Sequence, residues 1–256
     1  SITAQTNVSC FGNNSGSATV NANDGTAPYT YSWNTTPVQS GPTAVGLTGG
    51  TWTCTITDAN GCTTIRNVTI TEPAAALSSS IGAQTNVSCF GNSNGSATVN
   101  ASGGTGPYSF LWNTAPAQNG ASANNLSAGT WTCTITDANG CISTRNITIT
   151  QPAAALSSII SAQSDVSCFG NSTGSATASV NGGTAPYSYT WNTSPAQLSA
   201  NASNLPAGTW TCIITDANGC TTTTSATILQ PTSALSSTII TQTNVGCFGG
   251  NTGSAT

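Results

Sequence analysis

Charge is almost absent from this 256-residue sequence, which contains two basic and six acidic residues. The basic residues are Arg66 and Arg145, and the chain has no histidine, lysine or methionine. Two cations cannot form the basic surface that contacts nucleic-acid phosphates. They also cannot form a polybasic segment that binds an anionic membrane surface. We therefore expect no nucleic-acid partner.

Long apolar runs are missing as well. A membrane-spanning helix needs about 20 consecutive apolar residues, and no such run occurs, so we expect no membrane insertion in this segment. Disorder usually combines low hydrophobicity with high net charge. Here Val, Ile, Leu, Tyr and Trp recur at fixed positions, which predicts a folded core.

The residues of common catalytic and metal sites are scarce. General acid–base chemistry uses His, Lys or paired carboxylates, and the carboxylates here are spread one or two per repeat. Asp58, Asp137 and Asp216 recur in a predicted turn, but calcium needs about six to eight oxygen ligands. Without His or a CxxC pair a metal–cysteine site is also disfavoured. We expect no enzyme activity, no metal and no cofactor.

The chain is built instead on a strict period of 79 residues, which is typical of a tandem-repeat protein. The ten cysteines follow it, at Cys10, Cys54, Cys62, Cys89, Cys133, Cys141, Cys168, Cys212, Cys220 and Cys247. We divide the chain into a first repeat at 1–73, a second at 74–152, a third at 153–231 and the start of a fourth at 232–256. Because Ser1 aligns with Ser80, inside a repeat, we expect a window on a longer polymer.

Each repeat has the pattern of an all-β module. Short alternating apolar runs between Gly, Asn and Pro predict strands and turns rather than helices. In the first copy the predicted strands are 2–10, 17–22, 29–33, 51–58 and 62–71, with further short strands in 34–50. Residues 58–61 predict a type I turn closed by a left-handed glycine. About seven short strands in so small a module predict an immunoglobulin-like β-sandwich. The short linker at 74–77 favours modules stacked end to end as a rod.

Several motifs of the repeat occur together and in order. They stand at 7–12 (Asn-Val-Ser-Cys-Phe-Gly), 16–20 (Gly-Ser-Ala-Thr-Val), 28–33 (Pro-Tyr-x-x-x-Trp) and 50–62 (Gly-Thr-Trp-Thr-Cys-x-Ile-Thr-Asp-Ala-Asn-Gly-Cys). This set resembles the SprB-type repeat, found in very large surface adhesins of gliding Bacteroidota. The resemblance implies type IX secretion, gliding motility and cell-surface filaments. Repeats of that family usually carry two cysteines, at the positions of Cys10 and Cys62, and an aliphatic residue at position 54.

Regular cysteines in small modules predict disulfides and an extracellular, cell-surface location. Cys54 and Cys62 are about 13 Å apart along the predicted hairpin, too far for a bond. By analogy with the Cys–Trp–Cys core of immunoglobulin domains we prefer Cys10–Cys54, Cys89–Cys133 and Cys168–Cys212. Two alternatives stay open: the pairing Cys10–Cys62 that the resemblance implies, and a bond between modules that joins Cys10 to Cys141.

Two further sets of residues are candidate sites. Aromatic residues share one strand face and are weighed as glycan contacts against core packing; they are Tyr29, Tyr31, Trp33, Tyr108, Phe110, Trp112, Tyr187, Tyr189 and Trp191. Asn-x-Ser/Thr sequons predict glycosylation in a suitable host, and they lie at Asn7, Asn34, Asn67, Asn86, Asn146 and Asn192.

The leading functional hypothesis is the structural stalk of a very large secreted adhesin, which extends a surface-binding part and transmits force to it. The alternative is a repeated polysaccharide-binding module that uses the strand aromatics. The expected partners are neighbouring repeats of the same chain, laterally associated copies in a filament, and a surface polysaccharide.

Overall fold

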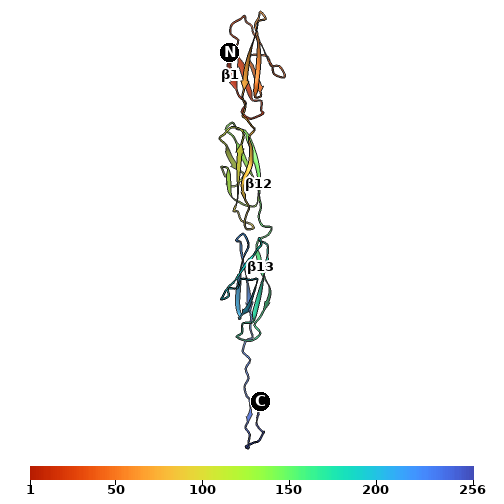
Figure 1. Cartoon of the computed structure of the whole chain (residues 1–256), viewed down its shortest axis with the longest axis vertical. Coiled ribbons are helices and arrows are strands. Elements are labelled where there is room, and N and C mark those ends of the chain that lie inside the picture. Colours follow the sequence, from red (N-terminus) through yellow and green to blue (C-terminus); the bar gives the residue numbers. More distant parts are fainter. The chain divides into compact units, whose positions relative to one another are not determined.

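The computed structural model describes all 256 residues, and every regular element in it is a β-strand. The strands gather into three successive groups along the chain, each with six strands (Figure 1). The first group contains β1 (Ile2–Thr6), β2 (Gly16–Val20), β3 (Thr30–Trp33), β4 (Thr43–Leu47), β5 (Gly50–Thr57) and β6 (Thr63–Ile70). No helix is present that is long and apolar enough to cross a membrane.

The second and third repeats follow the same order. The second contains β7 (Ser78–Thr85), β8 (Gly95–Ser102), β9 (Ser109–Trp112), β10 (Ser122–Leu126), β11 (Gly129–Thr136) and β12 (Ile142–Ile149). The third contains β13 (Ser157–Ser164), β14 (Gly174–Asn181), β15 (Ser188–Trp191), β16 (Asn201–Leu205), β17 (Gly208–Thr215) and β18 (Thr221–Ile228). The short pair β19 (Gln242–Thr243) and β20 (Ser254–Ala255) completes the list.

Each repeat is a sandwich of two antiparallel three-stranded sheets. In the first repeat one sheet has the order β1-β2-β4 and the other has the order β3-β5-β6. This is the topology of the A-B-E and C-F-G sheets of an immunoglobulin domain without its D strand. The predicted immunoglobulin-like fold class is therefore confirmed, with six strands per repeat rather than seven.

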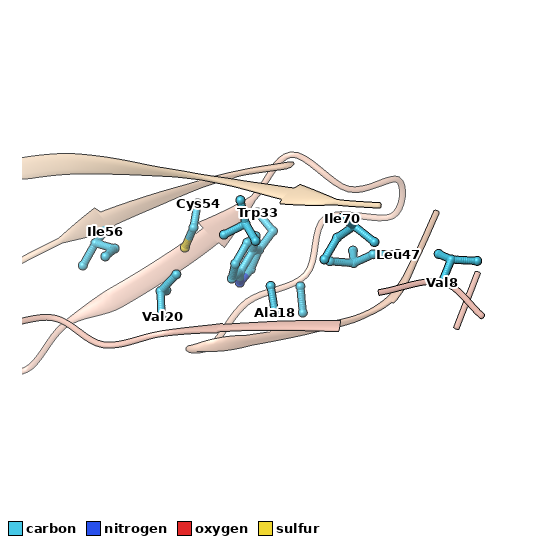
Figure 2. Close-up of a cluster of buried hydrophobic side chains, with 10 residues drawn as sticks. Val8, Ala18, Val20, Trp33, Leu47, Cys54, Ile56 and Ile70 are labelled. Carbon is cyan, nitrogen blue, oxygen red and sulfur yellow. The ribbon is translucent and has the colours of Figure 1, made fainter. Parts of the chain in front are cut away.

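The core of each sandwich lies around one tryptophan. Figure 2 shows Trp33 between the sheets, with Ala18 and Val20 on the facing strand. Trp33 is 1% exposed, and its Nε1–H donates to the carbonyl oxygen of Gly41 at 3.1 Å. Its neighbour in the sheet register is Cys54 of β5, which is fully buried. Residues alternate between the core and solvent along β2, as a half-buried strand requires.

The first strand ends earlier than its sequence predicts. β1 stops at Thr6, and the chain then leaves β2, because Val8 N–H donates to the carbonyl oxygen of Thr71 at 2.9 Å. The side-chain Oδ1 of Asn7 accepts a hydrogen bond from Thr71 N–H and secures this crossing. Val8 is buried, whereas Cys10 falls in a turn in which Asn13 N–H donates to the carbonyl oxygen of Cys10. Cys10 therefore lies outside both sheets.

The chain divides into two compact units. One contains Ser1–Val87 with Gly91–Gln151, and the other contains Ser88–Phe90 with Pro152–Thr256. Residues 88–90 thus group with the third repeat although they belong to the sequence of the second. No strand crosses a boundary between the four predicted ranges.

Replacing Trp112 with alanine tests the core. We expect the free energy of unfolding of the second repeat to fall by about 3–5 kcal/mol, the usual cost of truncating a buried aromatic side chain. Trp112 is 1% exposed, and its Nε1–H donates to the carbonyl oxygen of Gly120. Hydrogen exchange read out by mass spectrometry reports on each repeat separately. The control is Leu111→Ala, whose side chain is 51% exposed; equal effects of the two changes would contradict the core assignment.

Candidate functional site

The chemically distinctive feature of this chain is a pair of disulfides that join successive repeats. Cys10 bonds to Cys141 and Cys89 bonds to Cys220, with Cα–Cα distances of 5.7 and 5.8 Å. Both bonds span 131 residues. We call each of these bonds a staple. In the chain-entropy treatment, closing a loop of this length stabilises the folded state by on the order of 5 kcal/mol.

The staples correct the preferred cysteine pairing. The pairs Cys10–Cys54, Cys89–Cys133 and Cys168–Cys212 are wrong, because Cys54, Cys133 and Cys212 are buried free thiols. The pairing Cys10–Cys62 is also absent, since Cys62 is an exposed free thiol. The alternative that joins Cys10 to Cys141 between modules is the one that the structure contains.

The reason lies in where the two candidate partners point. Cys54 lies in β5 opposite Trp33 and projects towards Val20 on the facing sheet (Figure 2). Cys10 follows the end of β1 and lies in a turn outside the sandwich. A cysteine in that turn cannot reach the core but can reach the hairpin turn of the next repeat.

That hairpin turn is organised by Asp137, between β11 and β12. Its Oδ1 accepts hydrogen bonds from the N–H groups of Asn139 and Cys141, each at 2.9 Å. Its Oδ2 accepts one from Thr105 N–H, also at 2.9 Å. Asp137 N–H in turn donates to the carbonyl oxygen of Cys141 at 3.0 Å. One carboxylate therefore holds the backbone on both sides of the staple cysteine, and the predicted turn is confirmed.

The carboxylate is buried as well as hydrogen-bonded. Asp137 is 5% exposed. Desolvation raises its pKa, but the N–H donors of Thr105, Cys141 and Asn139 outweigh this and hold the pKa below the usual range. The pKa of Asp216 is lowered by equivalent donors. In the first repeat the N–H of Thr26 is the main cause that lowers the pKa of Asp58.

A second residue of the same turn reaches across to the preceding repeat. Asn139 Nδ2 donates to the carbonyl oxygen of Ser9 at 2.9 Å and to Thr105 Oγ1 at 3.1 Å. Asn218 makes the equivalent bond to Ser88 at 2.9 Å. Ser9 and Ser88 directly precede the bonded cysteines Cys10 and Cys89. The asparagine of the Asp-Ala-Asn-Gly-Cys turn therefore aligns the two halves of the staple, a role that the sequence analysis did not assign.

The linker between repeats packs beside the staple. Gly104 N–H donates to the carbonyl oxygen of Ala75 at 2.8 Å, and Gly183 N–H donates to that of Ala154 at 3.0 Å. A Cβ on Gly103, whose φ is +70°, would overlap the carbonyl oxygen of Ala76. The first repeat has Asp24 at this position. Glycine is thus required at 103 both for its conformation and for space.

The odd number of cysteines per repeat now has a physical account. Two of the three serve opposite junctions, one towards the following repeat and one towards the preceding repeat. The third, represented by Cys54, Cys133 and Cys212, packs in the core as a small apolar side chain. Desolvation raises the pKa of each of these thiols. The neutral thiol is a poor nucleophile, so these positions are chemically inert.

The strand aromatics do not form an exposed platform. Trp33, Trp112 and Trp191 are at most 1% exposed, so their assignment as glycan contacts is wrong. The tyrosines and Phe110 are half-buried and pack against the same cores. The hydroxyl group of Tyr108 donates to the carbonyl oxygen of Gly103 at 2.7 Å, which secures the loop after β8.

The asparagines of the six sequons are all exposed. Their side chains accept hydrogen bonds through Oδ1, as Asn34 does from Thr53 N–H at 2.7 Å and Asn192 does from Thr211 N–H at 2.8 Å. These bonds do not involve Nδ2, the atom that carries an N-linked glycan. Glycosylation at these positions stays a prediction.

The fold and the staples define a chain of tandem immunoglobulin-like β-sandwich repeats joined by disulfides. The SprB repeat model matches residues 2–37, 81–117 and 160–196, one segment in each repeat. The chain is therefore a SprB-type repeat protein, as its motifs predict. No curated protein matches it.

Solved structures with a similar arrangement of domains have low sequence identity. Three N-terminal domains of the outer capsid protein Hoc of bacteriophage RB49 match with 12% identity and a TM-score of 0.36, over 89% of this chain and 97% of that one. Three titin immunoglobulin domains match with 14% identity and a TM-score of 0.34, over 84% and 92%. A tetra-tandem repeat from the extending region of a large adhesion protein matches with 17% identity and a TM-score of 0.24, over 83% and 69%.

Thiol labelling tests the three environments of the cysteines. With a maleimide and no reductant, the folded chain should label at three exposed sites, Cys62, Cys168 and Cys247. Unfolding without reduction should raise the number of labelled sites to six, because the buried thiols Cys54, Cys133 and Cys212 become accessible. Unfolding with reduction should label all ten cysteines. Intact-mass spectrometry counts the labels, and rapid labelling of Cys54 in the folded chain would contradict its burial.

The Asp137 carboxylate should make the staple turn sensitive to acid. Its folded-state pKa lies below that of an unfolded Asp, about 3.9, so its stabilising contribution is present above that pH and lost as pH falls through the folded value. Asp137→Asn should lower Tm at pH 7 and weaken its acid dependence. It should also speed reduction of Cys10–Cys141 by a small thiol. Asp58→Asn changes the same turn where Cys62 is unbonded, so reduction of Cys10–Cys141 should keep its rate.

Proposed function

We propose that this chain is part of the structural stalk of a very large secreted cell-surface adhesin, where it extends a surface-binding part and transmits force to it. The observation that carries the proposal is the covalent staple between successive repeats. A disulfide between modules maintains their connection when noncovalent contacts separate. Such a bond suits a protein that bears load outside the cell.

An extracellular, cell-surface location is part of the proposal. Disulfides persist in oxidising compartments, and SprB repeats occur in all three modules. Type IX export and a part in gliding or attachment follow from the family resemblance and are proposed with it. We further propose that the stalk is not catalytic and that its function lies in its length and connectivity.

Polysaccharide binding is the competing function, and the fold weakens the case for it. The three tryptophans that would stack on sugar rings are buried between the sheets. Side chains such as Tyr31, Phe110 and Tyr189 are only half-exposed and support the cores. Carbohydrate binding through these residues would require the sandwich to open.

A binding assay separates the two functions. The purified, oxidised chain should be retained by no polysaccharide on a glycan array, whereas a dedicated binding module would be retained. Specific retention that is lost in Tyr31→Ala, with the fold preserved by circular dichroism, would favour the alternative. Lysozyme-free buffer with bovine serum albumin provides the background.

The stalk function itself is tested in the host cell. Deleting one whole repeat, residues 74–152, from the surface protein should shorten the filament seen by electron microscopy and leave attachment chemistry unchanged. A control carries conservative exposed changes, such as Thr3→Ser and Thr144→Ser, and should retain the full length. Loss of target recognition with unchanged filament length would argue against a stalk.

A further inference from the structure

We propose that the two staples, rather than the folds of the repeats, limit how far this chain extends under tension, because they remove most of the polypeptide from the load-bearing covalent path. The biological use of this property rests on the proposed stalk function. The physical claim depends only on which cysteines are bonded.

The two staples interleave along the sequence. Cys89, the start of the second bond, lies between Cys10 and Cys141, the two ends of the first. Two bonds that followed one another would each shorten a separate part of the chain. Interleaved bonds instead create a path that runs backwards through the middle repeat.

The shortest covalent path from Ser1 to Thr256 has three backbone segments. It follows nine residue steps from Ser1 to Cys10 and crosses the first staple to Cys141. It then runs back 52 steps to Cys89, crosses the second staple to Cys220, and follows 36 steps to Thr256. The path has 97 steps in all, compared with 255 along the backbone.

Two segments of 79 residue steps lie off this path. One runs from Cys10 to Cys89 and contains β2 to β7; the other runs from Cys141 to Cys220 and contains β12 to β17. Unfolding of these segments adds no length between the chain ends. At about 3.6 Å per residue, the fully extended chain would reach about 350 Å with the staples and about 920 Å without them.

The effect grows where every repeat is stapled to the next in this register. The path then needs only the 27 steps from Cys141 to Cys168 for every two repeats. That is a limit of about 97 Å for two repeats, compared with about 570 Å for the same 158 residues without staples, at about 3.6 Å per residue. Such a stalk would transmit force with little extension even after its sandwiches had unfolded.

Single-molecule force spectroscopy on the whole chain tests the proposal. Peptide tags at Ser1 and Thr256 attach the handles, and free thiols are first blocked with iodoacetamide without reduction. We expect a final contour length of about 350 Å for the oxidised chain and about 920 Å after reduction. A length near 920 Å before reduction would overturn the proposal.

Single-cysteine variants separate this connectivity from other pairings. Cys89→Ser and Cys10→Ser should each leave a path of 124 steps, about 450 Å at about 3.6 Å per residue. Pairing within repeats, as Cys10–Cys62, would give the intact chain a similar length but each variant 151 steps, about 540 Å. The latter result would overturn the proposal. Cys54→Ala is the matched control, because its thiol is unbonded, and it should keep the length of about 350 Å.

These measurements do not depend on the adhesin. A contour length of about 350 Å together with unchanged filaments after repeat deletion would uphold the mechanical inference and reject the stalk. Shortened filaments in the host together with a long oxidised chain would do the reverse.

Discussion

The arrangement of this chain depends on the hydrogen bonds that Asp137 and its equivalents accept. Three N–H groups converge on one carboxylate, and this fixes the backbone at Asn139 and Cys141. The asparagine then binds the carbonyl group beside the partner cysteine, and the two sulfur atoms meet. Without that turn the chain would have three separate sandwiches connected by short linkers.

The near absence of charge is compatible with this design because neutral groups satisfy the backbone. Side-chain amides and hydroxyl groups make most of the side-chain contacts, as Gln39 does with both the N–H and the carbonyl oxygen of Val45. Gln84 and Asn86 connect β7 to the end of β12 in the same manner. Hydrogen bonds between neutral groups depend little on salt, in contrast to exposed ion pairs.

Cys54 shows how a cysteine pattern misleads when it is compared with another sandwich. In an immunoglobulin domain the F-strand cysteine bonds across the core to the B strand. Here the B-strand equivalent β2 contributes Ala18 and Val20 to the core, so the F-strand cysteine has no partner and packs as an apolar group. The bonding capacity of the repeat is placed at its two ends instead, which turns a stabilising element of one domain into a connection between domains.

Much of the fold follows from the sequence alone. The period of 79 residues, the alternation along the strands and the Asp-Ala-Asn-Gly turn predict the sandwich class and the β5–β6 hairpin, since these signals are local. Sequence reasoning also excluded a bond between Cys54 and Cys62 from strand geometry. The strand 2–10 was predicted too long, because the side-chain bond from Asn7 that ends it connects residues 64 positions apart.

The staples could be listed among the alternatives but not chosen, because their partners lie 131 residues apart. Pattern and composition show that cysteines recur, but not which faces of successive modules meet. Only the tertiary structure places Cys10 outside its own sandwich, buries Cys54 against Trp33, and brings the turn of the next repeat to the remaining thiol. The sequence determines the module, and the packing of each module's end determines how the modules are joined.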